Sequence, residues 1–512
     1  MKPLAIGLKI SDHQYIIVRS LRSAIMNAPP TPSIPKPPAR RRLWWRIALP
    51  VLGLAILVVL GLWGIMVVGT QRAWEKAEDE AARGDPRWRL LEIEADRKQI
   101  PDPENSALHI MAVARKGGMV GVTGAPNYDQ VFDKLAPNVQ LNAQQEWLIR
   151  GELAKIAKPL AEARQLKDMP YGRFPIKYTD DYFGTLMNEQ QSARRLTDWL
   201  MHDAYLLAQE GEYDRAVESC QALLNTGRSI GDEPMLISHL IRMSMQLMSV
   251  RTLERVLAQG EVSEARLRAI QDLLEKEMRE FNFIQGVRGE RAGAHHLFEN
   301  LRSGKVKPTA FSVFVGVRTG GAADSVVGWF LDAFPSTLLK YYPEHLQQLN
   351  RAVEAAKLPH HERGTKLQEL ENDCKLSANP IAKMMAPALL HMHRADCRAQ
   401  INLRTALVGI ACERYRRDTG EWPASLDVLV EKKLLDAIPT DPMDGQPLRY
   451  RRTKVGVVIY SVGFDLTDDQ GNINWELQNA QGVDLRFRLW NPAQRRQPPG
   501  APIVPPVPEV PR

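Results

Sequence analysis

The stretch "AYLLAQEGEYDRAVESCQALL", Ala204 to Leu224, indicates the fold class most directly. Apolar residues recur at helical spacing on one face before the "GEYD" turn, and again after it. They are Leu196, Trp199, Leu200, Ala204 and Leu207 in the first segment, and Ala216, Val217, Cys220, Leu223 and Leu224 in the second. Two amphipathic helices joined by so short a turn form an antiparallel hairpin. The sequence therefore predicts a region built from helical hairpins.

The same stretch resembles one tetratricopeptide-type hairpin, with Gly211 in the turn, then Tyr213, and small Ala216 where the helices approach. No second copy follows at the 34-residue period of that family, so we expect TPR-like packing and not a TPR array. The segments "PMLISHLIRMSMQLMSVRTLERVL" and "SEARLRAIQDLLEKEMREF" extend the helical pattern. We predict a mainly α extracytoplasmic domain over residues 70–400, whose hairpins bind protein partners and whose methionines fill the core.

Residues 47–69 predict a transmembrane helix. The run "IALPVLGLAILVVLGLWGIMVV", Ile47 to Val68, carries no charge. At a rise of 1.5 Å per residue it spans about 33 Å, which is enough to cross a bilayer core. A basic, proline-rich segment (1–46) precedes it and "AEDEA" follows it, so the N-terminus is expected in the cytoplasm. We predict a single-pass protein of the bacterial cytoplasmic (inner) membrane with its bulk in the periplasm.

The basic overall charge belongs to the N-terminal segment. Residues 1–46 contain nine Lys and Arg against one Asp, and the net charge of the whole chain is +7. The rest of the chain is thus close to neutral, whereas a nucleic-acid-binding surface needs clustered basic residues. We therefore expect no nucleic-acid partner. At the other end, residues 491–512 are proline-rich and are predicted to form a disordered tail.

Few residues suggest catalysis, and no GxSxG, HExxH or Walker motif occurs. We predict that the protein is not an enzyme. An extracytoplasmic hydrolase stays an alternative, because carboxylate dyads leave no sequence signature. The four cysteines, Cys220, Cys374, Cys397 and Cys412, form no CxxC pair. Disulfides and buried free thiols are both open for them.

Several histidines and one glutamate are candidate functional residues. His391 and His393 diverge by about 200° on a helix and cannot easily share a metal, although His393 and Cys397 can face each other. The adjacent pairs His295–His296 and His360–His361 are expected at the surface. Glu290, which lies between arginines in "RGER", is expected to form an ion pair that organises the bundle.

Residues 401–490 predict a small α+β module. A helix stops at Gly420, and a short helix from Pro423 to Pro439 follows, with Leu426, Leu429 and Val430 on its apolar face. The runs "PLRYRR" and "VGVVIYSVG" then read as two antiparallel strands joined by a turn at residues 453–456.

This region resembles the major pseudopilin of bacterial type II secretion, over roughly residues 401–475. The matching residues are Tyr415, Asp418, Gly420, Pro423, Leu426, Leu429, Asp441, Pro442, Gly445, Pro447, Tyr450, Tyr460, Ser461, Gly463 and Asp465. The resemblance implies an α+β module with a calcium-ordered loop. The rest of the chain resembles single-anchor bacterial membrane proteins of unassigned function.

The implied calcium loop lies in "SVGFDLTDDQGN", residues 461–472. Asp465, Asp468, Asp469 and Asn472 offer the hard oxygen ligands that Ca²⁺ prefers. The alternative is that these side chains are solvated turn residues that make Asx hydrogen bonds.

The combined pattern favours a membrane-anchored scaffold or interaction protein with a pseudopilin-like, calcium-binding C-terminal module. The sequence lacks the Gly-Phe-type cleavage site and the early helix glutamate of pseudopilins. A component or relative of the type II secretion machinery is therefore the alternative, and the hydrolase is the second one.

Overall fold

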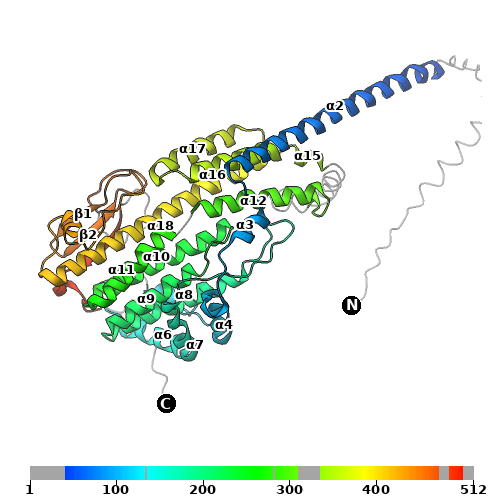
Figure 1. Cartoon of the computed structure of the whole chain (residues 1–512). Coiled ribbons are helices and arrows are strands. Elements are labelled where there is room, and N and C mark those ends of the chain that lie inside the picture. The colour runs from blue at the N-terminus through cyan, green and yellow to red at the C-terminus, as the bar shows by residue number, and fades with distance from the viewer. Residues whose placement is uncertain (1–40, 133–134, 281–282, 310–334, 472–483, 500–512) are drawn as a thin grey trace, which may run out of the picture. The chain divides into compact units, whose positions relative to one another are not determined.

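The computed structural model describes residues 41–132, 135–280, 283–309, 335–471 and 484–499. Over these residues the protein is mainly helical, with a small antiparallel sheet in its C-terminal part (Figure 1). Both features confirm the fold class predicted from the sequence. Contacts divide the chain into two units, residues 1–66 and 67–512.

The first unit contains the apolar part of helix α2 (Arg41–Gly84). The candidate span within it, Ala48–Gly84, is long and apolar enough to cross a membrane, and its most apolar window is not buried in protein. Leaving such a surface in water costs about 25 cal/mol per Å² of apolar area, a cost that a bilayer removes. Among the described residues this is the one helix long and apolar enough to span a membrane, so the predicted apolar helix is confirmed. It begins inside the predicted 1–46 segment, because residues 41–46 include no proline or glycine that would stop it.

In the second unit, the described helices between residues 90 and 168 are short, and those after residue 188 are longer except for Ser336–Leu339 and Asp427–Glu431. The α-helices are α3 (Leu90–Asp96), α4 (Ser106–Gly117), α5 (Tyr128–Phe132), α6 (Ala143–Ala154), α7 (Ala157–Ala163), α8 (Asn188–Gln209), α9 (Tyr213–Arg228), α10 (Leu236–Gln259), α11 (Glu264–Glu280), α12 (Phe283–Arg302), α15 (Ser336–Leu339), α16 (Tyr342–Ala356), α17 (His360–Leu376), α18 (Pro380–Thr419) and α19 (Asp427–Glu431). Three 3₁₀ turns cover Asp102–Glu104, Arg164–Asp168 and Pro492–Gln494.

Helices α8 and α9 form the hairpin that the sequence predicts. Gly211 in the turn has φ of 84°, in the left-handed region that glycine adopts without strain. Ala216 is fully buried, so the two helices approach closely at this small residue. Helix α10 packs against both members of the hairpin, and its Met243 and Met245 lie in the core as expected.

The sheet has three strands, β1 (Arg449–Thr453), β2 (Gly456–Ser461) and β3 (Leu485–Trp490), in the order β1-β2-β3 and all antiparallel. The β1–β2 hairpin was predicted, whereas β3 was not. Its sequence "LRFRLW" alternates arginine with apolar residues and lies far from the hairpin in sequence. The backbone N–H of Arg488 donates to the carboxylate of Glu254 on α10 at 3.0 Å, so β3 also contacts the helices.

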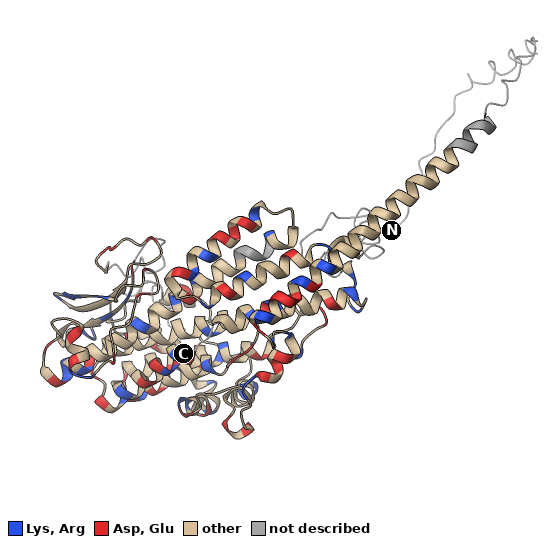
Figure 2. Cartoon of the chain, turned by 45° about the horizontal axis from the view of Figure 1, so that its top comes forward, with Lys and Arg blue, Asp and Glu red and all other residues tan. Residues whose placement is uncertain are grey.

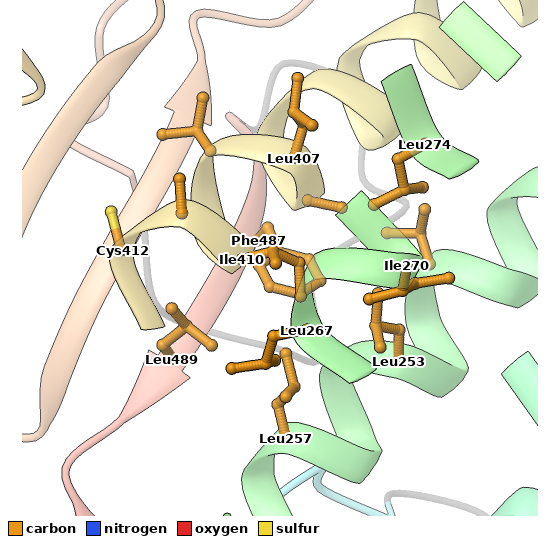
Figure 3. Packing of buried hydrophobic residues seen from close by; sticks show 14 of the residues in the cluster. Leu253, Leu257, Leu267, Ile270, Leu274, Leu407, Ile410, Cys412, Phe487 and Leu489 are labelled. Atoms are coloured by element: carbon orange, nitrogen blue, oxygen red, sulfur yellow. The ribbon is translucent and has the colours of Figure 1, made fainter. Parts of the chain in front are cut away.

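The sheet and the helical hairpins share one core (Figure 3). Phe487 of β3 lies fully buried among side chains of three helices, and no Cβ would fit at Gly409, where it would approach the ring to 2.5 Å. The core includes Leu253 and Leu257 of α10, Leu267, Ile270 and Leu274 of α11, and Leu407 and Ile410 of α18. Helix α18 also continues without a break through residues 400 and 401, where the module was expected to begin. Residues 401–471 and 484–490 therefore pack as part of the helical body.

Two predicted boundaries need correction. The second helix of the module is only α19, because Lys433 adopts φ of 57° and ends it well before Pro439. The second boundary is residue 491, where the disordered tail was predicted to begin. Arg495 is buried and bonds Glu413 at 2.7 Å, and Arg496 donates to the backbone oxygens of α8. These bonds fix the chain directly after β3. Arg495 and Arg496 therefore belong to the folded body, although the proline-rich pattern placed them in the tail.

Candidate ligand-binding pocket

A buried charge network joins α9, α10 and α11. Glu277 of α11 is fully buried, and its Oε2 lies 2.7 Å from Nη1 of Arg228 and 2.6 Å from Nη2 of Arg242. The side-chain amide of Gln246 donates to the other carboxylate oxygen. Burial alone would raise the pKa of the Glu277 carboxyl, but Arg242 and Arg228 outweigh it and hold that pKa below its usual range. The carboxylate therefore stays charged and fixes both guanidinium groups.

These two arginines form part of the wall of a cavity of about 440 Å³. This volume is within the range of small-molecule sites, about 300–1,000 Å³. Tyr171 and Gly172 from the segment before α8 also line it, together with Lys98 and His239. Burial lowers the pKa of His239 to about 4, so its ring is neutral at pH 7. The cavity thus combines an aromatic ring, a neutral imidazole and several cations.

The carboxylates in the lining are each bonded to an arginine. Asp96 pairs with Arg87 at 2.7 Å, and Asp232 pairs with Arg97 at 3.2 Å. Glu280 lies 2.5 Å from Nη2 of Arg228. The negative charges at this cavity are therefore compensated within the protein itself.

Two lysines lie over the Tyr171 ring: Lys98, which lines the cavity, and Lys276, which does not line it. The Nζ of Lys98 lies 3.7 Å from the centre of the Tyr171 ring, and the Nζ of Lys276 lies 4.5 Å from it. Within the described part of the chain, neither ammonium group has a carboxylate oxygen within 4.0 Å. A cation over a tyrosine ring gains only about 0.5–1 kcal/mol where water reaches it. Two positive charges beside one ring therefore favour an anion next to them.

Elsewhere on the helices, charges of both signs are interspersed (Figure 2). The prediction that Glu290 forms an ion pair is wrong. Glu290 is buried and accepts the backbone N–H of Leu236 at 3.2 Å, at the start of α10, while Arg288 and Arg291 pair with Asp85 at 2.6 Å. Burial raises the pKa of Glu290 to about 7. The helix rotates this side chain away from its neighbours in sequence, which the "RGER" pattern could not reveal.

The predictions for the remaining histidines are confirmed at some positions and wrong at others. His391 is exposed and His393 is buried, so they diverge as predicted, and Nε2 of His393 lies 3.5 Å from Sγ of Cys397. The surface prediction is wrong for His295, which is 1% exposed. His360 is partly exposed and lies 3.2 Å from Asp396. All four cysteines are free and buried.

The motif residues of the C-terminal region meet at Asp441, which is fully buried. Its Oδ1 accepts the hydroxyl of Ser461 at 2.7 Å, and its Oδ2 accepts the backbone N–H of Val462 at 3.1 Å. Arg449 donates to the same carboxylate at 2.7 Å. Asp441 thus joins the turn that contains Pro442 and Gly445 to the end of β2, where Tyr460 and Gly463 flank the contact. The hydroxyl of Tyr450 donates to the backbone oxygen of Pro423.

The predicted calcium residues lie on an exposed loop. Asp465 accepts the N–H of Thr467 at 3.1 Å, and Asp468 accepts that of Gln470 at 2.8 Å, which are the Asx turns of the alternative interpretation. Asp469 is also exposed, and Asn472 lies outside the described residues. The sequence missed Asp484, which is buried beside this loop and accepts the N–H of Gly471 at 2.7 Å. An aspartate just before an apolar strand was the available signal.

No family model, curated protein or solved structure matches the chain. The pseudopilin resemblance therefore stays a prediction carried by the residues around Asp441. Function is inferred below from the anchor helix, the pocket and the C-terminal loop.

Replacing Glu290 by glutamine is expected to change how stability depends on pH. The carboxyl pKa is about 7 in the folded chain, against about 4.3 when unfolded, so the linked stability is present below about pH 4.3 and is lost as the pH rises to 7. Glutamine still accepts the Leu236 N–H but carries no charge. The variant should match the original chain near pH 4.5 and exceed its free energy of unfolding by about 2–3 kcal/mol at pH 8.

Urea unfolding of the full chain in detergent micelles at both pH values measures this difference. Glu431→Gln, an exposed change on α19, is the matched control and should show no pH-dependent gain. A Glu290→Gln variant that is less stable than the original at pH 8 would show that the ionised carboxylate is stabilising.

Proposed function

We propose that the chain is a single-pass membrane protein whose extramembrane helices recognise an acidic group on a partner. The observation that carries this proposal is the pair of ammonium groups of Lys98 and Lys276 on the Tyr171 ring, at a cavity whose carboxylates are all bonded to arginine. A carboxylate or phosphate that enters the cavity would bond these lysines directly. The uncompensated positive charge would also attract it from a distance.

The anchor gives this binding site its location. The apolar stretch of α2 suits a bilayer core, and the arginines and lysines of residues 1–46 favour the cytoplasmic side for the N-terminus. In this proposal the helical body lies on the periplasmic side of a bacterial inner membrane. It holds its partner at the membrane surface, which is the role of a scaffold.

Binding is favoured over hydrolysis by the state of the carboxylates. Glu277 is held ionised by two arginines, and Glu280 is bonded to one of them. A general base needs a carboxylate that can take up a proton near neutral pH, which an arginine-bonded one resists. The pocket is accordingly proposed as a recognition site and not as an active site.

A second candidate function is kinship with the type II secretion machinery. The buried Asp441, which joins the motif turn to Ser461 and Val462, favours it because the resemblance is carried by those same residues. In that case the sheet would dock to other subunits while the apolar stretch of α2 provides the anchor.

The C-terminal loop is proposed to bind Ca²⁺. The Oδ1 atom of Asp484 is buried and has no hydrogen-bond partner among the described residues. Burial raises the pKa of Asp484, and the nearby carboxylates of Asp469 and Asp468 raise it further. A hard cation would satisfy the buried oxygen and neutralise this group. Asp465 of the same loop is a candidate further ligand, and Asn472, which the sequence also predicts as a ligand, lies outside the described residues.

The acidic-partner proposal is tested with a fluorescein-labelled hexaglutamate peptide and the full chain in detergent micelles. The double variant Lys98→Ala/Lys276→Ala should bind the peptide at least about tenfold more weakly, since each lost charge contact is worth about 1 kcal/mol. Added salt should weaken binding to the original chain. Fluorescence anisotropy gives both affinities.

The matched control is Lys432→Ala/Lys454→Ala, two exposed lysines that neither line the cavity nor lie over the Tyr171 ring, which should leave the affinity unchanged. Hexaglutamine should bind poorly to every form. Equal affinity of the peptide for both double variants would contradict the proposed site.

The calcium proposal predicts a gain in stability of the full chain. At a Ca²⁺ concentration 100 times the Kd, a single site adds about 2.7 kcal/mol to the free energy of unfolding. Asp484→Asn and Asp468→Asn should abolish the gain, and Asp436→Asn, an exposed change outside the loop, should keep it. Thermal unfolding with Ca²⁺ or with chelator measures the effect. A midpoint that calcium does not move would leave the loop as a pair of Asx turns.

A further inference from the structure

A cluster of ionisable side chains lies where the C-terminal part of α2 packs on α12. One possible ligand atom from each of Glu78, His295 and Glu299 lies within 4.8 Å of the others. Glu78 belongs to α2, while His295 and Glu299 lie one turn apart on α12. Residues four apart on a helix share a face, so both α12 side chains point to the same region.

The imidazole of His295 is fixed in a buried position. The Trp88 ring packs on it at a centroid distance of 4.5 Å, and Nδ1 lies 2.5 Å from the hydroxyl of Tyr342 at the start of α16. Among the described residues, the buried Nε2 atom makes no hydrogen bond. Oε1 of Glu299 is nevertheless only 3.3 Å from it. Nδ1 is thus bonded to Tyr342, and Nε2 faces the Glu299 carboxylate.

This geometry matches two ligands of one metal ion. Nitrogen and oxygen ligands that lie about 2.1 Å from an ion, at octahedral or tetrahedral angles, are separated by about 3.0–3.4 Å. The Nε2–Oε1 distance of 3.3 Å falls in this range. A metal-bound histidine commonly donates its other N–H to a fixed acceptor, and the hydroxyl oxygen of Tyr342 is placed to accept from Nδ1.

We propose that Glu78, His295 and Glu299 bind one divalent transition-metal ion of the Zn²⁺ class. One imidazole nitrogen and two carboxylates suit Zn²⁺ or Mn²⁺ better than Ca²⁺, which prefers oxygen ligands throughout. The Glu299 side chain is 42% exposed, so water can reach the ion and complete its coordination. Oε2 of Glu78 lies 3.5 Å from Arg89, while Oε1 accepts the Trp74 indole N–H and lies 3.8 Å from Nδ1 of His295. A rotation of the Glu78 carboxylate would bring an oxygen to an ion bound at Nε2.

Neighbouring side chains also hold the proposed ligands in place. The Trp74 indole N–H donates to Glu78 and helps to fix its carboxylate. A bound ion would connect α2 to α12 through metal–ligand bonds, and it would therefore stabilise the attachment of the α2 C-terminal segment to the helical body.

The test measures Zn²⁺ binding to the full chain in detergent micelles, after chelator treatment and dialysis. Calorimetric titration should give one high-affinity site per chain, and Zn²⁺ should raise the unfolding midpoint. Glu299→Gln and Glu78→Gln are isosteric changes at partly exposed positions on two different helices. Each should weaken Zn²⁺ binding at least tenfold. Tyr342→Phe should weaken it about 10–100-fold through the lost support of His295.

The matched control is Glu75→Gln, an exposed glutamate on α2 less than one turn before Glu78, which should bind Zn²⁺ like the original chain. Its result separates loss of a ligand from loss of nearby negative charge. The proposal is overturned if the original chain binds no Zn²⁺. It is equally overturned if Glu299→Gln and Glu78→Gln both retain the original affinity, because the ion would then be held elsewhere.

Discussion

The carboxylate of Glu277 lies buried between Arg228 and Arg242, and the placement of three helices follows from it. An ionised group in an apolar interior is tolerated only when its partners are complete, and removing one partner typically costs about 3–5 kcal/mol. Helices α9, α10 and α11 must therefore keep the register that brings these side chains together. The same two arginines form part of the cavity wall, so the network that orders the bundle also shapes the proposed binding site.

Helix α2 imposes a second constraint, since it contains two segments with opposite requirements. Its most apolar window is not buried by the described residues, whereas Trp74, Ala77 and Ala81 are buried in a core with Trp88 and Tyr342. Asp85, directly after the helix, bonds Arg288 and Arg291 of α12. The segment that follows the apolar stretch is thus fixed by packing and by charge. The proposed metal site adds a third kind of contact to this same attachment.

The fold was predictable where one periodic pattern determines the structure. The apolar faces around Ala204–Leu224 predict the α8–α9 hairpin, and the uncharged run from Ile47 predicts the long apolar helix. Strand β3 was not predictable in this way, because its pairing with β2 joins segments distant in sequence and arginines interrupt its apolar residues. Helix α18 likewise crosses the expected domain boundary, since one apolar face serves both the sheet and α11.

The candidate sites were less predictable than the fold, because burial and tertiary neighbours create them. Nothing adjacent to Glu277 in sequence indicates its two arginines, and Tyr171 meets Lys98 and Lys276 only in the folded chain. His295 was expected at the surface because its burial depends on Trp88 and Tyr342. The predicted aspartate loop lies on the surface. The buried Asp484 beside it was not predicted, because its burial depends on contacts that form only in the folded chain.

The proposed function requires that the apolar stretch of α2 is retained and holds the helical body at a membrane. Vesicle flotation of the expressed chain after alkaline and high-salt washing tests this requirement, with the mass of the recovered chain determined. We predict that the full-mass chain floats with the vesicles. A chain that is recovered in the soluble fraction, and that has lost the apolar segment before residue 70, would contradict it.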